Sequence, residues 1–488
     1  MEHKSYPTPH VLIFSVPLQG HLTPMLNLAE ILCLANVKVT FLNTTYNQKR
    51  LTKYTDIEAR FGRYSGFTFK TVPDGLPDDH PRSGDKTKLR EMFAALARSV
   101  KPLLKEIFVG KDEVTCIILD GWMGFVNDVA NEVKLPVITF MIPGANFIWT
   151  LQCLPKLIEA GELPFKDEDM DQLVKNAPGM DSFLRYRDLP CFCRDKDISV
   201  LLKHQDQFNS EIQRIKQAHT FILNSFEDLE GPILSLIREH CRGVYTIGPL
   251  HAHLKYRLNR KETTLSNTSS SDLWEVDRSC ISWLDQKPDK SVVYASFGTI
   301  TTITKDQMME FWAGLVQSKK YFLWVIKSDI ITGSGSDSPA HDDLVKETKE
   351  RGCIVSWAPQ EEVLAHRAVG GFFTHSGRGS VLESIVAGVP MLCWPYFSDH
   401  LVDSRFVSDV WKIGLDMKDT CDRKIVENMI KDLMERKKDE LGTSVSKLSH
   451  LAKKSISEGG SSYSNLDQLI EEIKGMTKKE EHYISSPQ

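Results

Sequence analysis

The stretch of sequence that decides the fold is residues 371–383, which read GFFTHSGRGSVLE. It opens with an apolar run suited to a buried strand and continues through a turn of small residues, and a helix is expected from about Ser380. A helix that begins directly after a parallel strand points its free backbone N–H groups and the positive end of its dipole at that turn. The segment therefore predicts a diphosphate-binding site at the carboxyl end of a strand.

Polar and aromatic side chains around this turn extend the predicted site. Trp357 offers a flat face for a base, and Gln360 can hydrogen-bond near the base or the ribose. Glu383 can hydrogen-bond a pair of ribose hydroxyls, while His375 and Ser380 add donors for the diphosphate. The alternative is a buried strand–helix unit with an incidental tryptophan, which would not explain so many polar groups at strand ends.

Short apolar runs recur along both halves of the chain, and each is followed by a longer segment with helical periodicity. They lie at 11–16, 37–42, 116–119, 137–140, 220–223 and 244–247 in the first half, and at 291–296, 322–326, 353–356, 371–374 and 391–394 in the second. Strands that alternate with helices predict parallel sheets covered on both faces, with right-handed connections. We therefore expect an α/β protein with two Rossmann-like, doubly wound parallel-sheet domains that face each other across a cleft.

A polar strip rich in Ser and Thr separates the two halves. It predicts an N-terminal domain over 1–250, a linker over 251–275 and a C-terminal domain over 276–456. A helix over 457–475 is expected to pack back on the N-terminal domain. A segment rich in Gly, Ser and Asp at 332–343 predicts a mobile loop in the second half.

Two residues at strand ends in the first half are candidates for catalysis. His21 follows the first strand in the segment LQGHLTP, residues 18–24, where Pro24 can start the next helix. Asp120 ends a later strand and could accept the imidazole N–H, which would fix its tautomer so that the histidine acts as a general base. The alternatives are a histidine satisfied by a backbone carbonyl and an aspartate that caps the helix near Met123.

The composition excludes several classes of protein. The chain has 488 residues and is 41% hydrophobic, and its 60 Lys and Arg against 65 Asp and Glu give a net charge of −5. So balanced a charge gives no electrostatic reason to bind nucleic acid or an anionic membrane. The 10 cysteines are scattered, no metal-ligand cluster is evident, and no apolar run reaches the ~20 residues that span a bilayer. We expect a cytoplasmic, soluble protein.

The segment from Trp357 to His400 resembles the signature of the plant family-1 UDP-glycosyltransferases in length and frame. Residues 292–299 resemble that family's phosphate-side strand and loop, and His21 and Asp120 resemble its catalytic pair. The resemblance covers nearly the whole chain and implies the GT-B fold. The nucleotide-sugar contacts that it implies are Trp357, Ala358, Gln360, His375, Gly377, Ser380 and Glu383 for UDP, Ser296 near the diphosphate, and Asp399 for sugar hydroxyls.

Departures from the family pattern concern the donor sugar. The family usually has Cys-Gly-Trp-Asn-Ser after its histidine, where this chain has SGRGS with Arg378 and Gly379, and Asp-Gln at the end of the signature, where His400 follows Asp399 here. Ile142 stands where the family has a threonine, and the resemblance implies that this threonine contacts the hexose 6-hydroxyl. Because an apolar group there would leave that hydroxyl unpaired, a donor without C6 is favoured.

These departures most resemble a legume flavonoid-glycoside 2''-O-apiosyltransferase, so the expected reaction adds apiose from UDP-apiose to a flavonoid glycoside. The alternatives are UDP-glucose or UDP-glucuronate as donor to a flavonoid or terpenoid aglycone. UDP-glucuronate is an alternative because Arg378 could pair with a uronate carboxylate. A nicotinamide-dependent oxidoreductase is a rival, but residues 377–382 have Leu382 where a dinucleotide fingerprint needs its third glycine. A non-catalytic nucleotide-sugar-binding protein is disfavoured by the intact pair of His21 and Asp120.

The resemblance implies an inverting reaction without metal or other cofactor, in a protein expected to be monomeric. His21 would take the acceptor proton, and Asp120 would stabilise the imidazolium. Aromatic and apolar residues suit a flat phenolic acceptor or a terpenoid. They are Trp122, Met123, Phe125, Phe147, Trp149 and the loops at 73–77 and 183–192.

Overall fold

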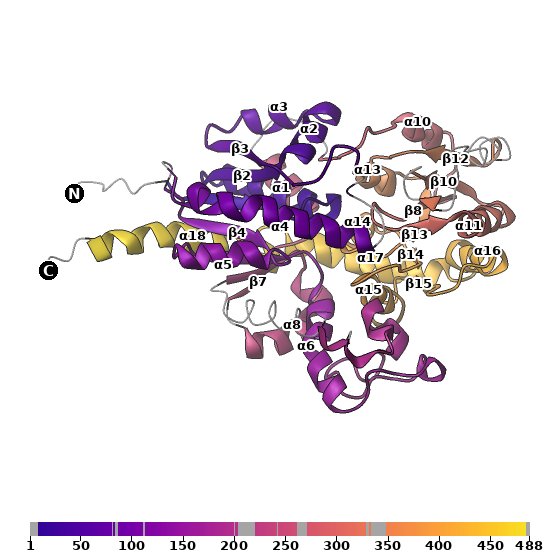
Figure 1. Ribbon diagram of the computed structural model, residues 1–488. Coiled ribbons are helices and arrows are strands. Elements are labelled where there is room, and N and C mark those ends of the chain that lie inside the picture. Colours follow the sequence, from indigo (N-terminus) through magenta and orange to yellow (C-terminus); the bar gives the residue numbers. More distant parts are fainter. Residues whose placement is uncertain are drawn as a thin grey trace.

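The computed structural model describes residues 8–80, 82, 86–110, 113–199, 201–203, 220–241, 243–260, 271–327, 331–332 and 348–484. Two parallel sheets lie beside each other, one built from the first half of the chain and one from the second (Figure 1). Helices cover both sheets, as the alternation of apolar runs and helical segments predicts. The fold is thus α/β with two Rossmann-like halves.

The first sheet has seven strands in the order β3-β2-β1-β4-β5-β6-β7, all parallel. Its strands are β1 (His10–Phe14), β2 (Lys38–Thr44), β3 (Phe67–Val72), β4 (Cys116–Asp120), β5 (Val137–Met141), β6 (Thr220–Leu223) and β7 (Val244–Thr246). The accompanying helices are α1 (Gln19–Leu34), α2 (Thr45–Tyr54), α3 (Ile57–Gly62), α4 (Lys86–Phe108), α5 (Gly124–Glu132), α6 (Ala145–Glu159), α8 (Glu227–His240) and α9 (Leu250–Arg260), with the short 3-10 helices η1 (Asp167–Asp169), η2 (Tyr186–Asp188) and η3 (Cys191–Arg194).

The second sheet has six strands in the order β12-β10-β8-β13-β14-β15 and is also parallel. Its strands are β8 (Val292–Ser296), β10 (Tyr321–Val325), β12 (Gly352–Val355), β13 (Val369–Thr374), β14 (Met391–Cys393) and β15 (Gly414–Asp416), and β9 (Ile303–Thr304) pairs separately with β11 (Ile331–Thr332). The helices are α10 (Ser279–Asp285), α11 (Lys305–Gln317), α13 (Gln360–Ala365), α14 (Arg378–Ala387), α15 (His400–Arg405), α16 (Arg423–Lys431) and α17 (Lys438–Ser455), with the π-helical turns η5 (Phe406–Val410) and η6 (Asp432–Arg436).

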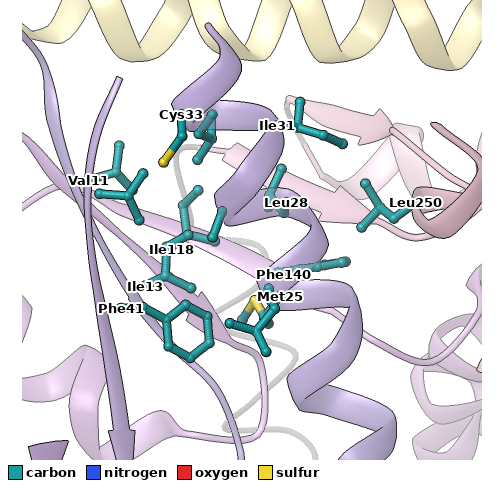
Figure 2. Packing of buried hydrophobic residues seen from close by; sticks show 14 of the residues in the cluster. Val11, Ile13, Met25, Leu28, Ile31, Cys33, Phe41, Ile118, Phe140 and Leu250 are labelled. Carbon is teal, nitrogen blue, oxygen red and sulfur yellow. The ribbon is translucent and has the colours of Figure 1, made fainter. Parts of the chain in front are cut away.

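Helix α1 is buried on nearly every side, which explains why its sequence is apolar around its whole circumference. Met25 and Leu28 pack in one cluster with Ile13 of β1 and Ile118 of β4, as Figure 2 shows from close by. Leu250 of α9 belongs to the same cluster. The helix whose first turn carries the candidate base is therefore fixed between the sheet and other helices.

The C-terminal helix α18 (Ser461–Ile484) returns to the first sheet. Leu466, Leu469 and Ile473 lie in the same buried cluster as β1 and α1. In Figure 1 this helix, drawn in yellow, lies beside the elements of the N-terminal half. The end of the chain thereby becomes part of the first half's core.

Several sequence expectations need correction. Helix α1 begins at Gln19, so Pro24 lies inside it and does not start it. Residues 250–260, placed mostly in a linker, form helix α9, because Leu250, Leu254 and Leu258 recur every four residues and are buried. The rest of the linker at 261–270 and most of the expected mobile loop at 332–343 lie outside the described residues.

Strands β3 and β15 were not expected from the sequence. β3 is half exposed at the edge of its sheet, and β15 is a three-residue edge strand, so neither has the continuous apolar run of a central strand.

Within the described chain, no helix combines the length and apolar character needed to cross a membrane.

Candidate active site

The first element of the site is a hydrogen-bonded pair of His21 and Asp120. Strands β1 and β4 are neighbours, so the end of β4 lies beside the turn that leads from β1 into α1. This places Asp120 Oδ2 2.7 Å from His21 Nδ1. Asp120 is fully buried, whereas 17% of the histidine side chain is exposed and lines a cavity. The alternative of a histidine satisfied by a backbone carbonyl is therefore not what the structure shows.

The Asp120 carboxylate is held by backbone N–H groups of its own turn and of the segment that follows β1. Trp122 N donates to Oδ1 at 3.2 Å and Val16 N donates to Oδ2 at 3.4 Å. Helix α5 starts after Met123 without a side-chain cap, so Asp120 does not act as the expected alternative N-cap. With Nδ1 bonded to Asp120, Nε2 is the histidine nitrogen that can accept a proton.

The charges around His21 raise its pKa. Burial by itself lowers this pKa, but the Asp120 carboxylate, through its charge and its hydrogen bond, and the more distant Asp399 outweigh it. A buried carboxylate that orients an imidazole and stabilises its cation is the arrangement of a general base. The pair can therefore remove a proton from a hydroxyl held in the cavity.

The second element of the site is the turn between β13 and α14. Gly377 precedes the first residue of α14, whose free backbone N–H groups face the cavity lined by Gly377 and Ser380. A Cβ atom on either Gly377 or Gly298 would lie 2.5 Å from His375 Nε2. Only glycine at these two positions leaves room for the His375 ring beside the end of β8, where Ser296 also lines the cavity.

The third element is a set of side chains at the start of α13 and inside α14. Gln360 Nε2 donates to Ser380 Oγ at 2.9 Å and to Glu383 Oε2 at 2.6 Å, and Gln360 Oε1 accepts from Tyr294 Oη at 3.2 Å. Burial, reinforced by the charge of Glu361, raises the pKa of Glu383 to about 8. The structure therefore brings Gln360 and Glu383, predicted beside the ribose, together with Ser380, predicted beside the diphosphate.

Trp357 is positioned by a segment that the sequence analysis treated as linker. Its Nε1 donates to Asp272 Oδ1 at 2.9 Å, and its ring lies 4.8 Å from that of Trp274. The next residue, Ala358, is buried and lines the cavity. Sequence reasoning missed Asp272 and Trp274, although an aromatic residue in a polar strip is a signal of contact with another part of the chain.

The fourth element is the part of the cavity wall to which Ile142, Gly379, Asp399 and His400 contribute. Burial lowers the pKa of His400 to about 3, so its imidazole is neutral. Burial raises the pKa of Asp399 to about 6, although the backbone, His21 and Arg378 oppose the shift. His400 Nδ1 accepts from Phe397 N at 3.3 Å, which fixes the ring.

Arg378 takes a different partner from the one expected. The sequence predicts a guanidinium beside the donor sugar, where it could pair with a uronate carboxylate. In the structure the guanidinium pairs with Glu230 and donates to Ser225 Oγ at 3.1 Å, and only 2% of the side chain is exposed. Sequence reasoning missed Glu230 because it lies 148 residues away and meets Arg378 only through the fold.

Most of these groups line one cavity of about 1300 Å³ between the two sheets, whereas Asp120 and Glu230 are fully buried and do not line it. Of the residues expected around an acceptor, Trp122, Phe125, Cys191 and Phe192 line it. Met123, Phe147 and Trp149 are buried in the core instead, and residues 73–77 do not contribute. Sequence reasoning missed Leu89, Arg90 and Phe93 of α4, which supply another part of the wall.

Four of the five Lys and Arg side chains of the cavity wall form ion pairs with carboxylates in the described part of the chain. The pairs are Arg60 with Glu30, Arg194 with Asp419, Lys255 with Glu361 and Arg378 with Glu230. Arg90 also lines the cavity, and no described carboxylate pairs with it. The described residues hold no group of three or more His, Cys, Asp or Glu side chains that could bind a metal ion.

Comparison with known proteins gives consistent matches. A family model described as UDP-glucoronosyl and UDP-glucosyl transferase matches residues 276–455. The chain is 50% identical over 476 residues to 7-deoxyloganetic acid glucosyltransferase of Catharanthus roseus, which covers 96% of this chain and 98% of the relative. It is 40% identical to a myricetin 3-O-rhamnoside 1,2-glucosyltransferase of Crocosmia x crocosmiiflora, over 96% of each chain.

Solved structures agree with the fold. The crystal structure of Os79 from O. sativa in complex with UDP superposes with a TM-score of 0.74 at 26% identity, covering 95% of this chain and all of that one. The likeness extends over both sheets, because so much of each chain is matched.

Proposed function

The chain belongs to the plant family-1 UDP-glycosyltransferases of GT-B fold, and from this membership we propose that it transfers glucose from UDP-glucose to a hydroxyl group of a plant small molecule. The observation that carries the proposal is the His21–Asp120 pair, which faces a diphosphate-type helix N-terminus across one cavity. A binding protein without catalytic activity would not need a carboxylate-oriented base at this place.

The proposed reaction is a single inverting displacement. The acceptor hydroxyl lies against His21 Nε2, which takes its proton as the oxygen forms a bond to the anomeric carbon. The bond between that carbon and the phosphate oxygen breaks, and its electron pair leaves with UDP. Asp120 stabilises the imidazolium that forms at His21.

The departing UDP is held by the second half of the chain. The diphosphate charge meets the backbone N–H groups at the start of α14, with Ser380, Ser296 and the His375 ring beside it. The uracil stacks on Trp357, and the ribose hydroxyls bond to Glu383 and Gln360. The pre-existing hydrogen bonds of Gln360 and the packing of Trp357 support these roles, because they fix both side chains before a ligand binds.

The choice of glucose rests on the relatives. The sequence analysis favoured a pentose such as apiose, with a glucosyl donor among the alternatives. The relatives reported above, at 50% and 40% identity, are both named as glucosyltransferases, which supports the glucosyl alternative. A hexose must then place its C6 hydroxyl against another polar group, because Ile142 cannot hydrogen-bond it.

The acceptor is proposed to be a small molecule with an apolar body, because aromatic and apolar side chains from α4, α5 and η3 line that part of the cavity. The 50% identical relative is named for an acid, 7-deoxyloganetic acid, so we propose hydroxylated acids as the first class of acceptor to test. The 40% identical relative is named for a myricetin 3-O-rhamnoside, so flavonoid glycosides are the second class. All ten cysteines are free thiols, which suits the cytoplasmic location predicted from the sequence. We also keep the prediction of a monomer.

A donor competition tests the proposal. UDP-glucose, UDP-apiose, UDP-xylose and UDP-glucuronate are offered in equal amounts with a hydroxylated terpenoid acid, a flavonoid aglycone and a flavonoid glucoside, and product masses are measured. Glucosylated product should dominate. A majority of pentosylated product would reinstate the donor predicted from the sequence, and His21→Ala should form no product while it still binds UDP.

A further inference from the structure

The guanidinium of Arg378 lies where the donor end of the cavity meets the first half of the chain. Arg378 is the first residue of α14 and lines the cavity, but its Nη2 is directed at Glu230 of α8 and Ser225. Both Arg378 and Glu230 are buried, at 2% and 0% side-chain exposure. An ion pair so deeply buried is costly to break from one side, because the remaining charge would be left without a partner.

The Glu230 carboxylate has two hydrogen-bond donors besides Arg378. Asn146 N donates to its Oε1 at 3.0 Å, and Ser225 Oγ donates to its Oε2 at 2.5 Å. Its backbone leaves the helical region, with φ −127° and ψ 16°, which puts a kink in α8 at this residue. The carboxylate is thus fixed at the guanidinium by backbone geometry and two further donors.

A second carboxylate and a glycine complete the surroundings of Arg378. Asp403 Oδ1 lies 3.5 Å from its Nη1 and accepts from Asn146 Nδ2 at 2.7 Å. A Cβ atom on Gly144 would lie 2.7 Å from Nη1 and 2.8 Å from the guanidinium carbon. Gly144 follows Ile142 and Pro143, which line the cavity, so the guanidinium is packed directly behind the cavity wall.

The donor end of the cavity therefore offers no uncompensated positive charge among the described residues. Arg378 is matched by Glu230, and burial lowers the pKa values of both His375 and His400 so that these rings are neutral. Burial raises the pKa of Asp403 to about 7, against the opposing charge of Arg378. The net charge of this group of side chains is then zero or negative at neutral pH.

We propose that Glu230 is a specificity-determining residue for the donor: by pairing with Arg378 it withholds the guanidinium from the cavity and so excludes donors whose sugar carries a carboxylate, such as UDP-glucuronate. This inference rests on the proposed function, and it explains physically why the enzyme would prefer an uncharged donor sugar such as glucose. A free guanidinium at the same place would pair with a uronate carboxylate in two-point geometry. Glu230 supplies that carboxylate from within the protein.

The test is a gain of function. Glu230→Gln combined with Asp403→Asn removes both negative charges. The amide oxygen at position 230 can still accept from Asn146 N, and the amide nitrogen can donate to Ser225 Oγ, which is itself able to accept. We expect the ratio of kcat/KM for UDP-glucuronate to that for UDP-glucose to rise at least about tenfold over the unmodified enzyme. Glu230→Gln alone should give a smaller rise, because Asp403 still competes for the guanidinium.

The matched control adds Arg378→Met to the same two substitutions. This triple variant has the same neutral carboxylate sites but no cation, so the ratio should return to that of the unmodified enzyme. An unchanged ratio in the folded double variant would overturn the proposal, as would a raised ratio in the triple variant, which would indicate a change of cavity shape instead of charge.

A measurement on the unmodified enzyme keeps the proposal testable if the variants do not fold. The inhibition constant of UDP-glucuronate against glucosyl transfer should be at least about tenfold higher than the dissociation constant of UDP-glucose, because the uronate carboxylate has no free cation to pair with. Equal affinity would overturn the role of Glu230. If the unmodified enzyme transfers no sugar from any UDP donor, the proposed function fails, and that outcome is distinct from both of these.

Discussion

At the scale of single residues, the sequence predicts the base and its orienting carboxylate because both follow from position on strands. His21 and Asp120 end neighbouring parallel strands, and such ends meet at one edge of a sheet. The partner of Arg378 could not be predicted in this way. Glu230 reaches Arg378 only through the relative placement of the two sheets, and no local pattern encodes that placement.

The first prediction concerns Asp120→Asn. The amide removes the negative charge that raises the pKa of His21, so burial should then bring this pKa below that of the unmodified enzyme. A general base acts in its neutral form, so kcat/KM falls as pH drops below the pKa of His21, and this acid limb should move to lower pH in the variant. The plateau rate should fall by a factor on the order of 10² to 10⁴, because the imidazolium loses its stabilising charge.

The measurement is a pH profile of kcat/KM, with UDP affinity measured by calorimetry as control. UDP should bind the variant as tightly as the unmodified enzyme, since Asp120 belongs to the first sheet and the nucleotide contacts to the second. An acid limb that does not move would remove His21 as the titrating base.

The second prediction concerns Glu383 and proton release. In the ligand-free protein its pKa is raised to about 8 by burial and by Glu361, so the carboxyl group is mostly protonated at neutral pH. Ribose hydroxyls that donate to it favour the ionised form and lower its pKa. Binding of UDP should therefore release up to about one proton, and affinity should rise as pH increases from about 6 to about 8.

Calorimetry in buffers of different protonation enthalpy measures this release. Uridine should give the same release as UDP, because the effect comes from the ribose and not from the diphosphate. Glu383→Gln should bind without it. Proton uptake by the unmodified protein, or an equal release by the variant, would contradict a carboxyl group that ionises on the ribose.

At the scale of secondary structure elements, the central strands and the edge strands β7 and β12 are predictable, whereas the edge strands β3 and β15 are not. β1, β4 and β8 are buried throughout, so they appear in the sequence as unbroken apolar runs. β3 alternates exposed and half-buried residues at the edge of its sheet, so its sequence FTFKTV lacks the continuous apolar run by which the central strands are identified. α9 shows that a polar composition can hide a buried stripe, because charged residues fill the face opposite its leucines.

Helix α4 carries the third prediction, which rests on the proposed function. Arg90 lies on its cavity face beside Leu89 and Phe93, and no described carboxylate pairs with it. It is thus the cation available to an acidic acceptor. Arg90→Gln should raise KM for a hydroxylated acid about tenfold and leave kcat nearly unchanged, because a charge-assisted hydrogen bond is lost in binding.

The methyl ester of the same acid serves as the control substrate, and its KM should be the same for the variant and the unmodified enzyme. Lys88→Gln is the matched control variant, since Lys88 lies on the same helix but does not line the cavity. Equal losses for the acid and its ester would mean that Arg90 shapes the cavity without recognising the carboxylate.

At the scale of the whole molecule, contacts between the two halves set the geometry of the cavity. Asn146 bonds to Asp403 at 2.7 Å, Arg194 pairs with Asp419 at 2.6 Å, and Lys418 Nζ lies 2.9 Å from Asp188. Each contact joins residues more than 200 positions apart, so none could be predicted from the spacing of residues in the sequence. The pattern of strands predicts two sheets and a cleft, but it does not predict how far apart the cleft walls lie.

The C-terminal helix α18 joins the two halves in a second way, and it carries the last prediction. Leu469 and Ile473 are fully buried in the cluster that holds α1 against β1, although they follow the whole second sheet in the sequence. Leu469→Ala or Ile473→Ala should lower the free energy of unfolding by about 2–5 kcal/mol, because each leaves a cavity in a packed core. Gln468→Ala, on the exposed face of the same helix, is the control and should change it little. Hydrogen exchange then locates the effect: amides of β1, β7 and α1 should exchange faster, while those of β8 and β13 keep their protection. Faster exchange in the second sheet alone would mean that α18 stabilises the half of the chain from which it departs.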